Sequence, residues 1–283
     1  MNTTIDPKWG QPDPTHDPYT LANFQPRATD VLITTGPKAG TTWMQQILHQ
    51  LRTGGDDTFS NIDDVVPWLE FPRPELTQAQ RQQQLEQMSN PRLFKTHCTY
   101  EQTPGADIAR IILTFRDPRD CCVSFYHHLR DMTDEAREAH NIPVPSSLEQ
   151  HVEKWLGFGS WYRNVSSWWP HRNQDNVLLL RYEDLLTDFS ANIEKILHFL
   201  DWELTDAQKQ RATEFASFAW MKQNASRFMM LRQGKPAFKP YGFIRKGQSG
   251  DGKAHLTPEM EQAILQKAYD SLSDDCLAFL HLR

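Results

Sequence analysis

A loop with one lysine between two glycines is the first place in this sequence where chemistry is expected. Residues 31–35 form a β-branched apolar run typical of a buried strand, and residues 36–40 interrupt it with turn-forming residues and Lys38. From Thr41 onward, apolar residues recur at helical spacing. A strand, a glycine-bearing loop and a helix together suit phosphate binding, because backbone N–H groups of the loop and of the first helical turn point at the anion. Lys38 adds a positive charge, and Thr41 and Thr42 add hydroxyl donors.

The spacing within this loop differs from that of the P-loop nucleotide triphosphatases. Their pattern has two glycines five positions apart, followed directly by lysine and a hydroxyl residue. Here Gly36 and Gly40 are four positions apart, and Lys38 precedes the second glycine. A P-loop kinase or triphosphatase stays open as an alternative, because Glu183 and Asp184 follow an apolar run and could hold a metal ion.

Two more cationic clusters follow along the chain. Arg116 ends the apolar run 111–115, and Ser124 lies two turns into the helix expected next. Residues 245–253 place an arginine and a lysine side by side before several glycines. The net charge of the chain is −6, so the whole molecule does not attract nucleic acid and each anion site must be local. Three cationic loops in an acidic protein indicate a ligand with several separated negative charges.

The first two clusters resemble motifs of the cytosolic sulfotransferase family. Residues 37–43 match the family's Pro-Lys-Ser-Gly-Thr-Thr-Trp loop at every position but one, where Ala39 replaces serine. The family also has a segment of the form Arg-x-x-x-Asp-x-x-x-Ser, which Arg116, Asp120 and Ser124 fit. In the family, the arginine and serine of that segment bind the 3′-phosphate of the co-substrate.

Two further segments extend the resemblance over roughly residues 31–257, with the motifs in the family's order. Residues 245–253 resemble the family's Arg-Lys-Gly-x-x-Gly-Asp-Trp-Lys signature, with Gly252 in place of the tryptophan. The family's catalytic base lies in a Lys-Thr-His motif, and residues 95–97 have that sequence. His97 also suits proton transfer on its own account, because histidine titrates near neutral pH.

The resemblance implies transfer of a sulfuryl group from 3′-phosphoadenylyl sulfate (PAPS) to a small molecule, leaving adenosine 3′,5′-bisphosphate (PAP), without a metal ion. It assigns His97 as the base, Lys38 to the oxygen that bridges sulfur and phosphate, and Lys95 to the sulfuryl oxygens. Ser124 would hold Lys38 until the acceptor binds. The positions implied to bind PAPS or PAP are Lys38, Ala39, Gly40, Thr41, Thr42, Trp43, Arg116, Ser124, Tyr182, Ser217, Phe218, Met221, Phe243, Arg245, Lys246 and Gly247.

A third class, a nonenzymatic nucleotide-binding or carrier protein, also stays open. Such a protein would use the same anion-binding loops and would not need a proton acceptor at position 97. Binding of PAP without magnesium favours sulfuryl transfer over a kinase, whereas tight binding of magnesium–ATP favours the kinase. A His97→Ala variant with unchanged turnover would favour the carrier.

The order of elements predicts a single α/β domain with a central, mostly parallel sheet flanked by helices. Strands are expected at residues 31–35, 92–97, 111–115 and 177–180, and helices after residue 41, over 76–88, 118–130 and 148–169, and around 193–200. Residues 1–28 are polar and rich in proline, so we expect an extended N-terminal leader, with the domain over residues 29–283. In such a sheet, ligands bind at the carboxyl ends of the strands.

The acceptor is not defined by these residues. Trp68, Phe71 and Tyr126, with the segment 228–241, are the expected walls of its pocket, and they suit a phenol, an alcohol, an amine or a lipid head group equally. Both a monomer and a homodimer are compatible with the chain, because Pro258 replaces the valine of the family's dimer motif. No signal peptide and no apolar run long enough to span a membrane is present, and the four cysteines lack metal-ligand spacing, so a cytoplasmic protein is expected.

Overall fold

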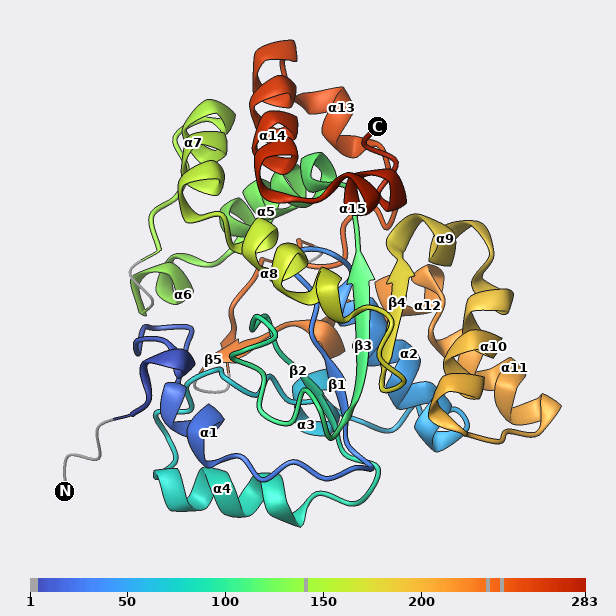
Figure 1. Cartoon of the computed structure of the whole chain (residues 1–283). Coiled ribbons are helices and arrows are strands. Elements are labelled where there is room, and N and C mark those ends of the chain that lie inside the picture. Colours follow the sequence, from blue (N-terminus) through green and yellow to red (C-terminus); the bar gives the residue numbers. More distant parts are fainter. Residues whose placement is uncertain (1–4, 140–141, 233–234, 240–241) are drawn as a thin grey trace.

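A four-stranded parallel sheet forms the centre of the computed structural model, which describes residues 5–139, 142–232, 235–239 and 242–283 (Figure 1). The strand order is β2-β1-β3-β4, with bounds Val31–Ile33 for β1, Leu93–Lys95 for β2, Arg110–Phe115 for β3 and Val177–Arg181 for β4. In the register, Val31 pairs with Leu93 on one side and with Arg110 on the other. The predicted α/β domain with a central parallel sheet is confirmed.

Alternate residues of the strands face two separate cores. Leu32, Ile111 and Leu113 pack in one apolar cluster, whereas their neighbours Ile33 and Ile112 pack in the other. A strand turns successive side chains to opposite faces, so nearly continuous apolar runs are needed when both faces are covered. This two-sided burial is the reason that the strand segments lack polar alternation.

One face of the sheet is covered mainly by helices from the two ends and the middle of the chain: α1 (Pro18–Asn23), α4 (Gln78–Gln87), α5 (Pro118–Asp131), α7 (Leu148–Phe158), α8 (Ser160–Trp168), α14 (Pro258–Ser271) and α15 (Asp274–Phe279). The other face is covered by α2 (Thr41–Thr53), α3 (Ile62–Val65), α9 (Tyr182–Thr187), α10 (Phe189–Leu200), α11 (Asp206–Phe215) and α12 (Phe218–Gln223). The remaining elements are η1 (Pro7–Trp9), α6 (Asp134–Ala139), η2 (Trp169–His171), η3 (Ala225–Phe228), the antiparallel pair β5 (Leu231–Arg232) and β6 (Lys235–Pro236), and α13 (Asp251–His255).

Two expectations need correction. The helix predicted over 148–169 is divided by Gly159, whose φ of 61° ends α7 in a left-handed conformation that glycine adopts without strain. Residues 5–28 are not simply extended, because they contain η1 and α1, and Leu21 and Phe24 are buried in the core. The domain boundary at residue 28 remains a prediction.

The carboxyl ends of the strands meet at one edge of the sheet, and the chain leaves them in loops that hold the predicted site residues. Figure 1 shows α5 beginning where β3 ends, with α13 and α14 beside it. The ladder continues for one residue past two strands, since Thr34 N–H donates to Ile112 O and Thr96 N–H donates to Ile33 O. None of the helices in the described ranges has the length and apolarity that crossing a bilayer requires.

Candidate active site

A cavity of about 640 Å³ lies at the carboxyl ends of the strands. Its size is typical of small-molecule sites, which occupy roughly 300–1,000 Å³. Among the described residues its lining has a surplus of positive charge, with the carboxylates of Asp13 and Glu70 outnumbered by the cations Lys38, Lys95, Arg116, Arg163, Arg245 and Lys246. A ligand with several negative charges is therefore complementary to this cavity.

The loop before α2 has the backbone of an anion cradle. Lys38 has a φ of 64° and Gly40 a φ of 96°, so two nearby residues adopt left-handed conformations and turn the chain sharply into the helix. The Thr35 and Thr41 hydroxyls lie 2.6 Å apart and join the two ends of the loop. Arg116 donates to the Lys38 carbonyl oxygen at 3.2 Å, which ties the loop to the end of β3.

Gly40 provides a direct test of this loop. A Cβ at Gly40 would lie 2.8 Å from Cδ2 of Tyr182, and the positive φ adds strain for any other residue. We therefore expect Gly40→Ala to lower the free energy of unfolding by about 1–3 kcal/mol in urea denaturation and to weaken PAP binding. Gly157→Ala in α7 is the control, because nothing lies within 4 Å of its Cβ, and we expect a gain of about 0.5–1 kcal/mol. Equal effects of the two substitutions would contradict this structure of the loop.

The Lys38 side chain is partly buried and has one neutral partner. Its Nζ lies 3.2 Å from Nδ1 of His128 in α5. The predicted partner Ser124 lines the cavity one turn earlier in the same helix but is not hydrogen-bonded to Lys38 in the structure. Burial, followed by the positive charge of Arg116, lowers the pKa of Lys38 to about 8. The ammonium is therefore still mostly charged at neutral pH.

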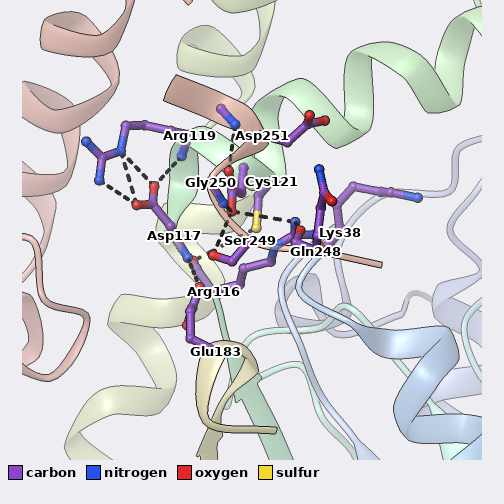
Figure 2. A network of polar contacts seen from close by, with 12 residues as sticks. Lys38, Arg116, Asp117, Arg119, Cys121, Glu183, Gln248, Ser249, Gly250 and Asp251 are labelled. Carbon is purple, nitrogen blue, oxygen red and sulfur yellow. Dashed lines mark hydrogen bonds and ion pairs between the residues drawn. The ribbon is translucent and has the colours of Figure 1, made fainter. Parts of the chain in front are cut away.

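Arg116 connects three segments, as Figure 2 shows. Besides the Lys38 carbonyl it donates to Gln248 O at 3.0 Å, and its guanidinium lies 4.4 Å from the centre of the Tyr182 ring. The nearest carboxylate is that of Asp120 at 3.6 Å. The Arg116 Nε is buried without a hydrogen-bond partner among the described residues. A buried arginine with a donor to spare suits an incoming anion.

Asp120 holds the C-terminal cationic loop against α5. Its carboxylate accepts the Gly250 N–H at 2.8 Å, the Gly252 N–H at 2.7 Å and the Ser249 hydroxyl at 3.2 Å. A Cβ at Gly252 would lie 2.7 Å from the carbonyl carbon of Arg119. This packing explains why glycine replaces the family tryptophan, because no side chain fits between α13 and the start of α5.

Arg245 and Lys246 share one counter-ion. Both donate to the carboxylate of Asp251, with Lys246 at 2.5 Å. Burial disfavours the charged form of Asp251, but hydrogen bonds from Lys246 and Arg245 outweigh it and lower the pKa of Asp251 to about 2. The adjacent Gly247 has a φ of 60°, and a Cβ there would clash with the ring of Phe218, so the loop packs directly on α12.

His97 is held so that one ring nitrogen is left for a ligand. Its backbone N–H donates to Glu70 Oε1 at 2.7 Å, and its Nδ1 lies 2.7 Å from the Thr35 carbonyl oxygen. Since a carbonyl only accepts, Nδ1 carries the proton and Nε2 is the basic nitrogen. Burial lowers the pKa of His97, although the Glu70 carboxylate opposes the shift. At neutral pH the imidazole is therefore unprotonated and able to accept a proton.

Lys95 and the predicted pocket aromatics lie together next to His97. The Lys95 ammonium is 3.4 Å from the Asp63 carboxylate and 5.0 Å from the centre of the Trp68 ring. Trp68 also packs edge-on against His97 at 5.1 Å and on Phe71 at 4.7 Å. Trp68 and Phe71, the predicted walls of the acceptor pocket, both line this cavity.

An aromatic slot lies beside the first anion loop. The Trp43 ring packs against Tyr182 and stacks on Phe189 at 5.5 Å, while its Nε1–H donates to the Ala216 carbonyl at 2.8 Å. The loss of the family threonine at position 216 therefore leaves this backbone contact intact. Phe218 and Met221 line the same cavity, as do Phe243, Thr41 and Thr42.

Three predicted residues lie outside the cavity lining. Ala39 is 1% exposed and packs in the core. Its methyl group therefore offers no substitute for the serine hydroxyl that the family has at this position. The Ser217 hydroxyl caps α12 by accepting the Trp220 N–H at 3.2 Å. Tyr126 turns toward its own helix, where Arg130 donates to its hydroxyl at 2.7 Å. Tyr126 is therefore not a wall of this pocket, and Tyr241 lies outside the described residues.

Sequence reasoning missed several contributors. Glu70 lies in the proline-rich segment that we expected to supply only apolar walls, and His128 follows the Arg116–Ser124 motif by one turn. The N-terminal segment also reaches the cavity, through Gln11, Asp13, Thr15 and His16. One signal was present for His128, since it lies four positions after Ser124 and therefore on the same face of α5. Glu70 and the N-terminal residues gave none, because tertiary packing alone brings them here.

Comparison with known proteins agrees with this geometry. The model of the sulfotransferase domain family matches residues 28–276, and the chain therefore belongs to that family. It is a PAPS-dependent sulfotransferase, an enzyme with PAPS as co-substrate and a small-molecule acceptor. The P-loop kinase or triphosphatase and the nonenzymatic binding protein are thereby set aside.

Similar proteins extend over most of the chain. Sulfotransferase 1E1 of Homo sapiens is 32% identical over 267 residues, which cover 90% of this chain and 88% of the human protein. An amine sulfotransferase of Oryctolagus cuniculus is 31% identical over 278 residues, which cover 92% of this chain and 86% of the rabbit protein. Among solved structures, mouse sulfotransferase SULT7A1 complexed with PAP shares the fold with a TM-score of 0.72 at 24% identity, covering 93% of this chain and 92% of that one.

Proposed function

We propose that this enzyme transfers the sulfuryl group with His97 as general base and Lys38 and Lys95 as the charge-stabilising groups. The observation that carries this assignment is the orientation of His97. Its Nδ1 is hydrogen-bonded to the Thr35 carbonyl, which leaves the basic Nε2 to accept a proton. His97 lines the same cavity as both lysines. The three groups that such a transfer requires therefore line one cavity.

The proposed reaction forms one bond to sulfur and breaks another. The acceptor oxygen attacks sulfur, its proton moves to His97 Nε2, and the bond between sulfur and the bridging oxygen breaks with both electrons going to that oxygen. Lys38 offsets the charge that develops on the leaving oxygen, and Lys95 offsets the charge on the sulfuryl oxygens. By analogy with phosphoryl transfer, such steps depend mainly on positioning and electrostatic stabilisation.

The remaining cations fit the other end of PAPS. The 3′-phosphate would be held by Ser124 and by Arg116, whose Nε–H is unpaired among the described residues. Arg245, Lys246 and the backbone of Gly247 would complete this phosphate site. Asp251 neutralises Arg245 and Lys246 in the structure. The phosphate would take its place as their counter-ion, so both cations would be paired with and without the nucleotide. Trp43, Phe218 and Met221 would form the adenine slot.

For the acceptor we propose a flat, largely apolar molecule with a hydroxyl, such as a phenol. The support comes from four aromatic side chains of the lining that are not assigned to the nucleotide: Trp68, Phe71, Phe125 and Phe238. Rings of this kind bind planar apolar surfaces well. An amine acceptor is the second candidate. It is favoured by Glu70, which is 3% exposed and has Oε2 buried without a hydrogen-bond partner among the described residues.

An acceptor screen with ³⁵S-labelled PAPS tests this function. We expect labelled product and PAP in equal amounts, in the presence of EDTA, with phenols turning over faster than matched aliphatic alcohols and amines. Faster turnover of amines would replace the phenol by the second candidate. Absence of label transfer to any class, with the protein folded and able to bind PAP, would overturn the proposed catalytic assignment.

The oligomeric state stays a proposal as well. Thr257 accepts the Met260 N–H and Pro258 occupies the first turn of α14, so this pair serves as a helix start. We propose a monomer on this ground, and analytical ultracentrifugation distinguishes it from a homodimer.

A further inference from the structure

His128 is a histidine of the cavity that the reaction described above does not use. It lies four residues after Ser124 on α5, and both side chains line the cavity. Its Nδ1 is 3.2 Å from the Lys38 Nζ. No other hydrogen bond of this ammonium occurs within the described part of the chain, so His128 is the group that fixes where the Lys38 charge lies.

The imidazole of His128 is neutral. An ammonium has only protons to give, so Nδ1 must offer its lone pair and the ring proton must be on Nε2. Burial, followed by the charges of Lys38 and Lys95 and by His97, lowers the pKa of His128 well below its ordinary value. His128 is therefore a hydrogen-bond acceptor toward Lys38 across the physiological pH range.

The ring is held in place by aromatic neighbours. Its centre is 4.5 Å from that of Phe238, 5.9 Å from that of Phe243 and 5.9 Å from that of Phe125. Lys38 Nζ itself lies 5.5 Å from the centre of the Phe243 ring. The apolar surroundings leave the imidazole few alternative orientations, and Nδ1 stays directed at the lysine.

We propose that His128 is a positioning residue, which holds the Lys38 ammonium as a neutral acceptor until the bridging oxygen of PAPS takes it over. This proposal rests on the proposed role of Lys38. A neutral acceptor suits such an exchange, because one charge-assisted hydrogen bond replaces another. A carboxylate at position 128 would form a buried ion pair with Lys38, and breaking such a pair is costly.

The surroundings of Lys38 make the contact measurable. Burial lowers the pKa of Lys38 most, and the charges of Arg116 at the end of β3, Lys95 at the end of β2 and Arg245 in the C-terminal loop lower it further. A hydrogen-bond acceptor favours the charged form of an ammonium, so the contact with His128 opposes the lowering of this pKa. Without that acceptor the pKa falls further, and Lys38 becomes neutral at a lower pH.

The test compares two substitutions at position 128. His128→Asn keeps an acceptor oxygen near the place of Nδ1, whereas His128→Phe keeps an apolar ring and removes the acceptor. The readouts are the pH profile of kcat/KM for PAPS and the NMR titration of Lys38 in protein labelled with ¹³C at the lysine ε-carbon. His127→Asn, one position earlier on α5 and outside the cavity lining, is the control.

We expect the basic limb of kcat/KM, near pH 8 in the unaltered enzyme, to move down by about one to two pH units in His128→Phe. His128→Asn and His127→Asn keep the limb close to its original position. An unmoved limb and an unmoved Lys38 titration in His128→Phe would overturn the proposal, and so would an equal shift in His128→Asn. If the unaltered enzyme transferred no sulfuryl group, the proposed function would fail, whereas the Lys38 titration would still decide the contact with His128.

Discussion

Replacing His97 with alanine is expected to lower kcat by about 10²- to 10⁴-fold while PAP binds as before. In the proposed mechanism Nε2 of the imidazole accepts the hydroxyl proton, and Nδ1 orients the ring through the Thr35 carbonyl. The cationic contacts proposed for PAP come from other loops, so the loss is confined to the chemical step. Single-turnover kinetics with PAPS, together with PAP titration by calorimetry, separates the two quantities.

The pH profile of the unaltered enzyme provides an independent check on His97. Burial lowers the pKa of this histidine, and Lys95 and Lys38 add to the effect of burial while Glu70 opposes it. The imidazole is active when unprotonated, so kcat/KM rises with pH on the acidic side, with its midpoint below 6.5. That limb should vanish in His97→Ala. Wild-type turnover by this variant, or an acidic limb that it retains, would rule out His97 as the base.

The second large effect is expected at Arg116. Arg116→Met should weaken PAP binding by about 10- to 100-fold or more. Each hydrogen bond to a charged group contributes roughly 1.5–3 kcal/mol, and about 1.4 kcal/mol corresponds to a factor of ten in affinity. Arg116→Lys should recover only part of the loss, since an ammonium keeps the charge but not the planar fork of donors. Calorimetric titration with PAP measures both variants.

Arg119 offers a matched control three residues away. It pairs with Asp117 and Glu261 and does not line the cavity. Arg119→Met should therefore lower the free energy of unfolding but leave the affinity for PAP essentially unchanged. A similar loss of affinity in the two methionine variants would mean that the Arg116 effect comes from the fold and not from contact with phosphate.

Much of the fold could be predicted from local patterns. The apolar runs at 31–35, 111–115 and 177–180 contain β1, β3 and β4, and β1 and β3 are buried on both faces, an arrangement that needs no polar alternation. The first anion loop was predictable for a similar reason, because its strand, turn and helix are consecutive in sequence. Gly159 was harder, since a glycine within an apolar helical pattern does not by itself show that it adopts a positive φ.

The parts of the site that could not be predicted depend on contacts between distant segments. Glu70 reaches the His97 backbone from a proline-rich loop, and His128 reaches Lys38 across 90 positions of sequence. Tyr126 was misplaced because adjacent positions on a helix point in different directions, and the cavity faces Phe125 instead. Such contacts follow from helix packing, which a single sequence does not specify.

A crystal structure of the protein with PAP would show whether separate cationic loops hold the two ends of one nucleotide. We predict the 5′-phosphate on the backbone of residues 38–42, and the 3′-phosphate within hydrogen-bond distance of Arg116, Ser124 and the loop 245–247, with no metal ion between them. A PAP molecule outside the cavity, bound in the reverse direction, or held only through a magnesium ion would show that these loops do not bind the nucleotide in this way.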